Sequence, residues 1–140
     1  MKRFVVSLAL LSACSGSTDP ASDLQVRLTV EPTSASLGDT VRLTVIAFNP
    51  TERTIEILPG QCGHSLVALV TEPAGVPHPL WGGPSRCPIY DDNVLTAGET
   101  DSVVWRWKAG PVLGTYSIRG GIARGTALVN PTTPSLLEVH

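Results

Sequence analysis

Apolar and polar residues alternate along several short segments of this chain, as they do in strands that bury one face. The alternation is strict from Leu24 to Val30, continues from Val41 to Phe48, and returns from Asp101 to Lys108. Ser65–Thr71 is instead a continuous apolar run of strand length. The 12 prolines and 13 glycines separate these segments, and no segment combines a helical period with capping residues.

Three further segments have the length and residue types of strands, namely Thr54–Leu58, Thr115–Ala123 and Leu136–Val139. Together the segments predict about seven or eight strands. Many short strands separated by turn residues are typical of two antiparallel sheets that pack face to face. The pattern therefore predicts an all-β chain folded as an antiparallel β-sandwich.

The first residues follow a different pattern. A basic start is followed by an apolar run, Phe4–Leu11, that is much shorter than the ~20 residues needed to span a bilayer. Leu11-Ser12-Ala13-Cys14 then resembles the lipobox of bacterial lipoproteins, in which the leader is cleaved and the cysteine is lipidated. The resemblance implies a signal peptide over residues 1–13 and a lipid anchor on Cys14. An ordinary secretory signal beside a chance cysteine is the alternative.

This interpretation sets the domain boundaries and the location. Residues 14–23 are small and polar and predict a flexible tether, and residues 24–140 are long enough for one domain. The protein is expected to be exported and held at a bacterial membrane by its lipid. Ser15 rather than an aspartate follows the cysteine, which by the sorting convention of this class favours the outer membrane where there is one.

The charged residues exclude one class of partner. The chain has a formal net charge of −2, which becomes more negative once Lys2 and Arg3 leave with the leader. No cluster of basic residues follows in the sequence, so no nucleic-acid partner is expected. No cofactor is expected either.

Two cysteines remain besides Cys14. In an exported chain, Cys62 and Cys87 most simply form a disulfide, which would close a loop and contribute roughly 3 kcal/mol to stability. A metal site made of Cys62, His64 and Cys87 is the alternative, although it lacks a fourth ligand at a recognisable spacing. No metal is therefore expected.

The longest predicted loop, Pro73–Asp92, contains the longest irregular stretch, Pro73–Pro88, which is rich in proline and glycine. The loop carries Trp81 and Tyr90, and the Cys62–Cys87 bridge would limit its freedom. Loops at the ends of a sandwich carry recognition because the sheets beneath hold them rigidly. We therefore expect a binding loop with these two aromatic residues, unless Trp81 instead covers one open end of the core.

Two polar groupings could be assembled into sites, and each has a simpler explanation. His64 and Ser65 could join Asp91 or Asp92 in a catalytic triad, but the Gly-x-Ser-x-Gly elbow of hydrolases is missing, which favours a polar loop. The run from Asp91 to Asn93 lacks the ligand spacing of a calcium loop, which favours a solvated turn. No catalytic residue is therefore predicted.

Trp105 and Trp107 lie on one face of their predicted strand, together with Val103. Such a pair could stack on a sugar or a peptide. More often it packs in the core of a sandwich, where each indole N–H finds a partner.

Several turns and strands resemble the BsuPI-type intracellular proteinase inhibitor domain, a bacterial immunoglobulin-like fold. The matching pieces, in chain order, are Asn49, Thr54–Ile57, Gly60-Gln61, Leu66–Ala68, Gly75, Trp81, Leu95–Thr100, Trp107 and Gly114–Tyr116. The likeness covers roughly residues 41–122, most of the folded part. Ala97 replaces a proline of the family, and Cys62 stands where the family usually has an aromatic residue.

The resemblance implies an immunoglobulin-like sandwich and, through the family's name, inhibition of a proteinase. The lack of a catalytic constellation favours instead a non-enzymatic, lipid-anchored module of the cell envelope, with a protein-binding or structural role. A proteinase inhibitor is the second hypothesis, and a small hydrolase is the third.

Overall fold

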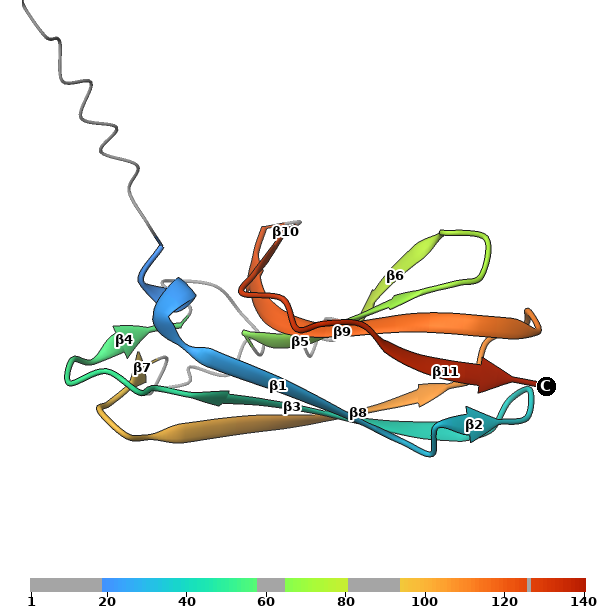
Figure 1. Ribbon diagram of the computed structural model, residues 1–140, viewed down its shortest axis with the longest axis horizontal. Coiled ribbons are helices and arrows are strands. Elements are labelled where there is room, and N and C mark those ends of the chain that lie inside the picture. Colours follow the sequence, from blue (N-terminus) through green and yellow to red (C-terminus); the bar gives the residue numbers. More distant parts are fainter. Residues whose placement is uncertain (1–18, 58–64, 81–93, 126) are drawn as a thin grey trace, which may run out of the picture.

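The computed structural model describes residues 19–57, 65–80, 94–125 and 127–140. These residues form one short 3-10 helix and eleven strands (Figure 1). The helix η1 is Pro20–Asp23, and the strands are β1 Gln25–Glu31, β2 Ser34–Ala35, β3 Thr40–Phe48, β4 Ile55–Glu56, β5 Leu66–Thr71, β6 Pro77–Leu80, β7 Val94–Leu95, β8 Thr100–Lys108, β9 Gly114–Arg124, β10 Ala127–Val129 and β11 Ser135–Val139. Within these residues, no helix is long and apolar enough to cross a membrane.

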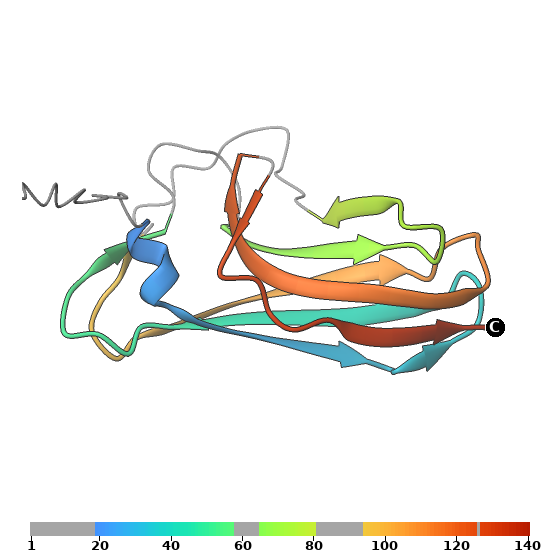
Figure 2. The ribbon, with the colours of Figure 1, turned by 45° about the horizontal axis from the view of Figure 1, so that its top comes forward.

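Two sheets pack face to face and contain most of the strands (Figures 1 and 2). The smaller sheet has the order β1-β3-β8 and is antiparallel throughout. The larger sheet has the order β2-β11-β9-β5-β6, with β10 paired to β9, and only the short β2 pairs in parallel. At one end, β4 and β7 form a separate ladder. The predicted antiparallel β-sandwich is confirmed.

Alternation in the sequence locates the long strands well. The predicted segments coincide with β1, β3, β5, β8, β9 and β11 to within about one residue at each end. The short strands β2, β6, β7 and β10 are not predicted, so the number of strands in the described residues exceeds the expected seven or eight. These four have two to four residues each, too few to establish a period of two.

Alternate residues from both sheets meet in a single apolar core. Its largest fully buried side chains are Tyr116, Leu24, Leu43, Ile55, Leu66, Leu95, Ile118, Ile122, Leu137, Val41 and Val45. In β8, the inward positions are Val103, Trp105 and Trp107, as the alternation predicts. Both tryptophans are half-buried against the core, and the Trp105 indole nitrogen donates to the Leu66 carbonyl of the opposite sheet at 3.3 Å. The core explanation of this pair is confirmed.

Tyr116 fixes the turn that leads into β9. Its side chain is fully buried, and its hydroxyl donates to the Val112 carbonyl at 2.9 Å and accepts from the Val112 N–H at 3.3 Å. Its ring lies 5.2 Å from that of Trp107, between centroids, at a tilt of 58°. A Cβ at Gly110 would lie 2.8 Å from the hydroxyl oxygen, so glycine is needed there. Such a tyrosine corner is a hallmark of immunoglobulin-like sandwiches.

A buried asparagine joins the turns at the opposite end of β3. The Asn49 amide nitrogen donates to the carbonyl oxygens of Arg53, Leu95 and Thr96 at 2.8, 2.8 and 3.1 Å. Its side-chain oxygen accepts from the Thr51 N–H at 3.0 Å and from the Thr51 hydroxyl at 2.7 Å. One fully buried side chain therefore satisfies backbone groups of two separate turns.

The turn from Leu95 to Thr100 is stabilised by its own side chains. Gly98 has a φ of +75°, a conformation that glycine adopts without strain. The Glu99 carboxylate accepts from the Thr96 N–H at 2.7 Å and from the Thr96 hydroxyl at 2.9 Å. The backbone hydrogen bond, and then the hydroxyl, hold the pKa of Glu99 below its ordinary value. The turn therefore contains its own network of polar contacts.

The packed domain begins before Leu24. Asp19 caps η1 by accepting from the Ala21 N–H at 2.9 Å, and Ala21 is fully buried. The Asp19 carboxylate also binds Arg124 of β9, with 2.7 Å between Oδ2 and Nε. Residues 19–23, which the sequence places in a flexible tether, are thus packed on the sandwich.

Charge pairing is part of what holds η1. The hydrogen bond from Arg124 is the main reason why the pKa of Asp19 lies below its ordinary value of 3.8. The ionised carboxylate is favoured in the folded state, so this contact contributes its full stability above pH 3.8. The contribution is lost as the pH falls through the lower pKa of the folded protein.

Candidate functional site

The site residues predicted from the sequence lie outside the described residues. They are Cys14, Cys62, Trp81, Cys87 and Tyr90. The lipid anchor, the disulfide and the aromatic binding loop therefore stay predictions. His64 and the run from Asp91 to Asn93 also lie outside the described residues.

Part of the predicted irregular stretch is a strand. Residues 77–80 form β6, which pairs with β5 in a hairpin whose turn contains Gly75 with a φ of +85°. The expectation of an irregular chain throughout Pro73–Pro88 is therefore wrong for these residues. Pro77 and Pro79 obscure the strand in the sequence, yet proline is tolerated on the edge of a sheet.

Ser65, the nucleophile of the triad that the sequence suggests, is among the described residues. It is only 7% exposed, and its carbonyl accepts from the Ala123 N–H at 2.8 Å. The residue therefore continues the pairing between β5 and β9. Among the described residues, no group of three metal-ligating side chains occurs.

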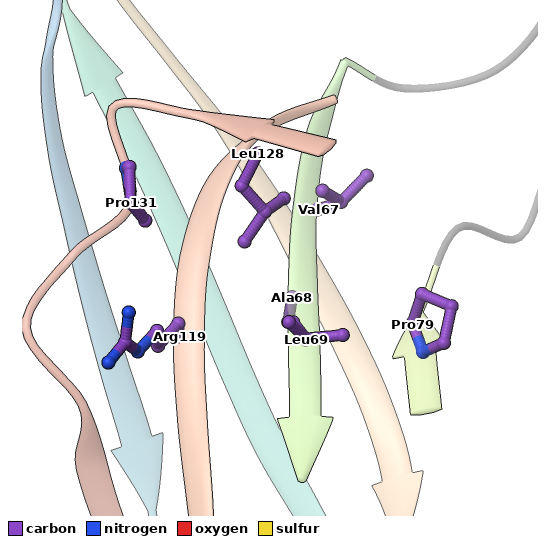
Figure 3. Close-up of a pocket in the computed structure, with 7 residues that line it drawn as sticks. All are labelled: Val67, Ala68, Leu69, Pro79, Arg119, Leu128 and Pro131. Atoms are coloured by element: carbon purple, nitrogen blue, oxygen red, sulfur yellow. The ribbon is translucent and has the colours of Figure 1, made fainter. Parts of the chain in front are cut away.

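An apolar hollow lies on the outer face of the larger sheet (Figure 3). It has a volume of about 190 Å³ and is lined by Val67, Ala68, Leu69, Pro79, Arg119, Leu128 and Pro131. The floor comes from β5, one side from β6, and the opposite side from β10 and the segment that follows it. We call this site the outer hollow.

The sequence of β5 and β9 explains why the outer hollow is apolar. Val67 and Leu69 occupy the outward positions of β5, which in a half-exposed strand would be polar. Gly121 of β9 lies opposite Val67, and a Cβ there would come within 3.2–3.3 Å of the Leu128 side chain. The missing side chain at Gly121 therefore lets Leu128 lie across the sheet and cover Val67, which is 1% exposed.

Hydrogen bonds hold the segment after β10 in place. Asn130 adopts a φ of +51°, which asparagine tolerates better than most residues, and its amide donates to the Leu24 carbonyl. Thr132 then pairs with Gly120, its N–H donating to the carbonyl at 2.8 Å and its hydroxyl accepting from the N–H at 3.0 Å. Pro131, between these two anchors, is thereby fixed beside the outer hollow.

Arg119 is the single charged residue that lines the outer hollow. It points outward from β9, opposite Leu69 of β5, and its side chain is exposed. Within the described residues it has no ion pair, in contrast to Arg124 of the same strand. The hollow thus offers an apolar floor with one available guanidinium at its edge, which suits an apolar side chain that lies next to a carboxylate.

Sequence reasoning misses the outer hollow, although one signal points to it. The continuous apolar run of Ser65–Thr71 places Val67 and Leu69 on the face opposite the core, whereas a strand with one solvated face would alternate. The β10 hairpin that covers Val67 leaves no comparable pattern, because it has only three residues.

No protein-family model and no curated protein matches the chain. Among solved structures, the CARDB domain of a Pyrococcus furiosus protein, in complex with di-metal ions, is similar over 84% of this chain and 88% of that chain. Its TM-score is 0.53 and its sequence identity is 14%.

Parts of two larger enzymes have the same fold. A β-glucosidase from Listeria innocua has a TM-score of 0.52 at 11% identity, and an alkylpurine DNA glycosylase from Pseudomonas fluorescens has 0.54 at 10%. This chain is covered to 84% in both, yet it spans only 16% and 30% of their respective lengths. At these identities the similarity concerns the fold alone. The protein is an immunoglobulin-like β-sandwich domain.

Proposed function

We propose that this protein is a non-enzymatic, lipid-anchored module of the bacterial cell envelope that binds another protein at the outer hollow. The observation that carries the proposal is the apolar surface of Leu69 and Leu128 beside Arg119, which has no ion pair within the described residues. Leu69 and Leu128 are half-buried on the face of the sheet opposite the core, so they do not serve the packing of the core.

The size of the outer hollow favours a protein over a free small molecule. Its volume of about 190 Å³ is below the roughly 300–1,000 Å³ typical of small-molecule sites. A space of that size accepts one or two side chains of a partner. Pro79, which lines the hollow, precedes Trp81 of the predicted binding loop by two residues in the sequence.

Two described carboxyl groups with lowered pKa values have structural roles. Both Asp19 and Glu99 accept hydrogen bonds that hold η1 and a turn, and these bonds lower their pKa values. Neither lines the outer hollow.

The proposed location rests on the sequence motif that ends at Cys14. Cys14 is proposed to carry the lipid, with the preceding residues removed as a signal peptide. The disulfide between Cys62 and Cys87 is proposed for the same reason, because an exported chain meets an oxidising compartment. Ser15 favours the outer membrane in a bacterium that has one.

Photo-crosslinking in cells tests the binding site. A photoreactive amino acid at Leu69 should crosslink one envelope protein, whereas the same probe at Leu113 should not. Leu113 is a suitable control because it is 59% exposed and lies before β9, about 20 Å along the strand from Arg119.

Binding of the purified partner then gives the quantitative prediction. Leu69→Asp should weaken the affinity at least about tenfold, as loss of a hot-spot residue does, while Leu113→Asp should leave it unchanged. Unaltered affinity in Leu69→Asp, or the same crosslinks from both positions, would remove the outer hollow as the binding site. Stoichiometric inhibition in a protease panel would instead support the BsuPI-type inhibitor.

A further inference from the structure

The outer face of the smaller sheet gathers cations from three strands. Its outward positions are the alternate residues of β1, β3 and β8 that point away from the core, and most of these residues are polar. Their side chains are exposed or half-buried. Four of the cations in the chain stand at these positions, namely Arg27, Arg42, Arg106 and Lys108. We call this surface the basic face. No run of basic residues marks it in the sequence, because each strand contributes only one or two.

The strand register places like charges together on the basic face. Arg42 lies directly opposite Arg106, and Lys108 is the next outward residue of the same strand. Like charges directly opposite each other destabilise a sheet. On the other side of β3, Glu31 of β1 lies directly opposite Arg42.

Within the part of the chain that the structure describes, these cations form no ion pair, whereas two other arginines do. Arg53 binds Asp23, and Arg124 binds Asp19, so the cations near η1 are neutralised within the domain. Among the described residues, no ion pair involves a cation of the basic face. A protein of net charge −2 therefore presents one face on which four cations outnumber the carboxylate of Glu31.

Apolar side chains accompany the cations. Ile46 and Phe48 are half-buried in a shallow depression of about 260 Å³ with Arg27 at its edge, and Val104 is 43% exposed. Cations beside apolar side chains are characteristic of surfaces that lie in the interface of a bilayer, where the charges meet headgroups.

The start of the packed domain limits how far it can stand from an anchor. Only residues 15–18 separate Cys14 from Asp19, a distance of at most about 18 Å when fully extended. A lipid on Cys14 would thus keep the domain against the bilayer, and β1 of the basic face begins at the same end of the sandwich (Figure 1).

We infer that the basic face lies on the membrane and binds the phosphates of anionic phospholipid headgroups. The orientation rests on the lipid anchor of the proposed function, whereas the affinity for anionic lipid is a property of the folded domain. The opposite sheet, with the outer hollow, then faces away from the bilayer toward a protein partner.

Vesicle binding without the anchor tests the inference. A chain of residues 15–140 retains every element that the structure describes. It should sediment with vesicles of phosphatidylcholine and phosphatidylglycerol, but much less with phosphatidylcholine alone, and added salt should release it. The double variant Arg42→Gln/Arg106→Gln should bind roughly thirtyfold more weakly, since each cation near an anionic surface contributes roughly fivefold.

Arg53→Gln is the matched control, because it removes one exposed arginine outside the basic face and should change vesicle binding less than about twofold. Equal binding to both kinds of vesicle would overturn the inference. So would an Arg53→Gln effect as large as that of Arg42→Gln, or tighter binding to duplex DNA than to anionic vesicles. The crosslinking at Leu69 does not involve the basic face, so the two proposals can fail separately.

Discussion

Replacement of Tyr116 by alanine should lower the free energy of unfolding by about 3–5 kcal/mol, the cost of removing a buried aromatic side chain. The residue is fully buried, its ring contacts Trp107, and its hydroxyl satisfies both backbone groups of Val112. Collapse of the surroundings cannot fill the space, because the side chain lies between two sheets. Urea-induced unfolding, followed by tryptophan fluorescence, measures the loss.

Tyr116→Phe separates the contribution of the ring to stability from that of the hydroxyl. It keeps the packing and removes only the contacts to Val112, so it should cost about 1 kcal/mol. Leu136→Ala, at a position 61% exposed, should be almost neutral. Equal free energies of unfolding for the wild-type chain and Tyr116→Ala would contradict the burial of Tyr116 in the core.

Asn49→Ala should destabilise the domain by about 2–4 kcal/mol. The Asn49 amide donates three hydrogen bonds to the turns at Arg53 and at Leu95–Thr96, and the contact with the Leu95 carbonyl is buried. A buried carbonyl left without its donor costs about 1–3 kcal/mol, and the missing side-chain atoms add to that loss. The same unfolding measurement gives the value.

Thr51→Ala is the control for the asparagine. It removes the hydroxyl that donates to Asn49 at 2.7 Å and leaves the three donated bonds intact, so the expected cost is only about 1 kcal/mol. The difference between the two variants measures the bonds that Asn49 donates. Variants of equal stability would mean that the turns are held by other contacts.

The fold was predictable from the sequence because it depends on burial with a period of two. The alternation of burial extends over all nine residues of β3 and over residues 102–108 of β8, and it leaves little ambiguity. The helix η1 is missed because it has four residues, although Asp19 followed by Pro20 is a recognisable cap and first-turn pair. Short elements such as β2 and β10 exist only through pairing with longer strands, which a local pattern does not reveal.

The candidate surfaces were less predictable, since each joins residues that are distant in the sequence. The basic face brings Arg27, Arg42 and Arg106 together through the register of three strands. The outer hollow depends on Gly121, whose missing side chain admits Leu128. The lipidation of Cys14 is instead predicted from a short local motif, and such a motif can be recognised in the sequence alone.

The most direct test of the account is the intact mass of the protein exported by a bacterium. A lipid-anchored module should begin at Cys14, carry a diacylglycerol on its sulfur, and sediment with membranes, because two acyl chains hold a protein firmly. Cys14→Ala should move to the soluble fraction or keep its leader. A free Cys14 thiol on a fully soluble wild-type protein would contradict the account.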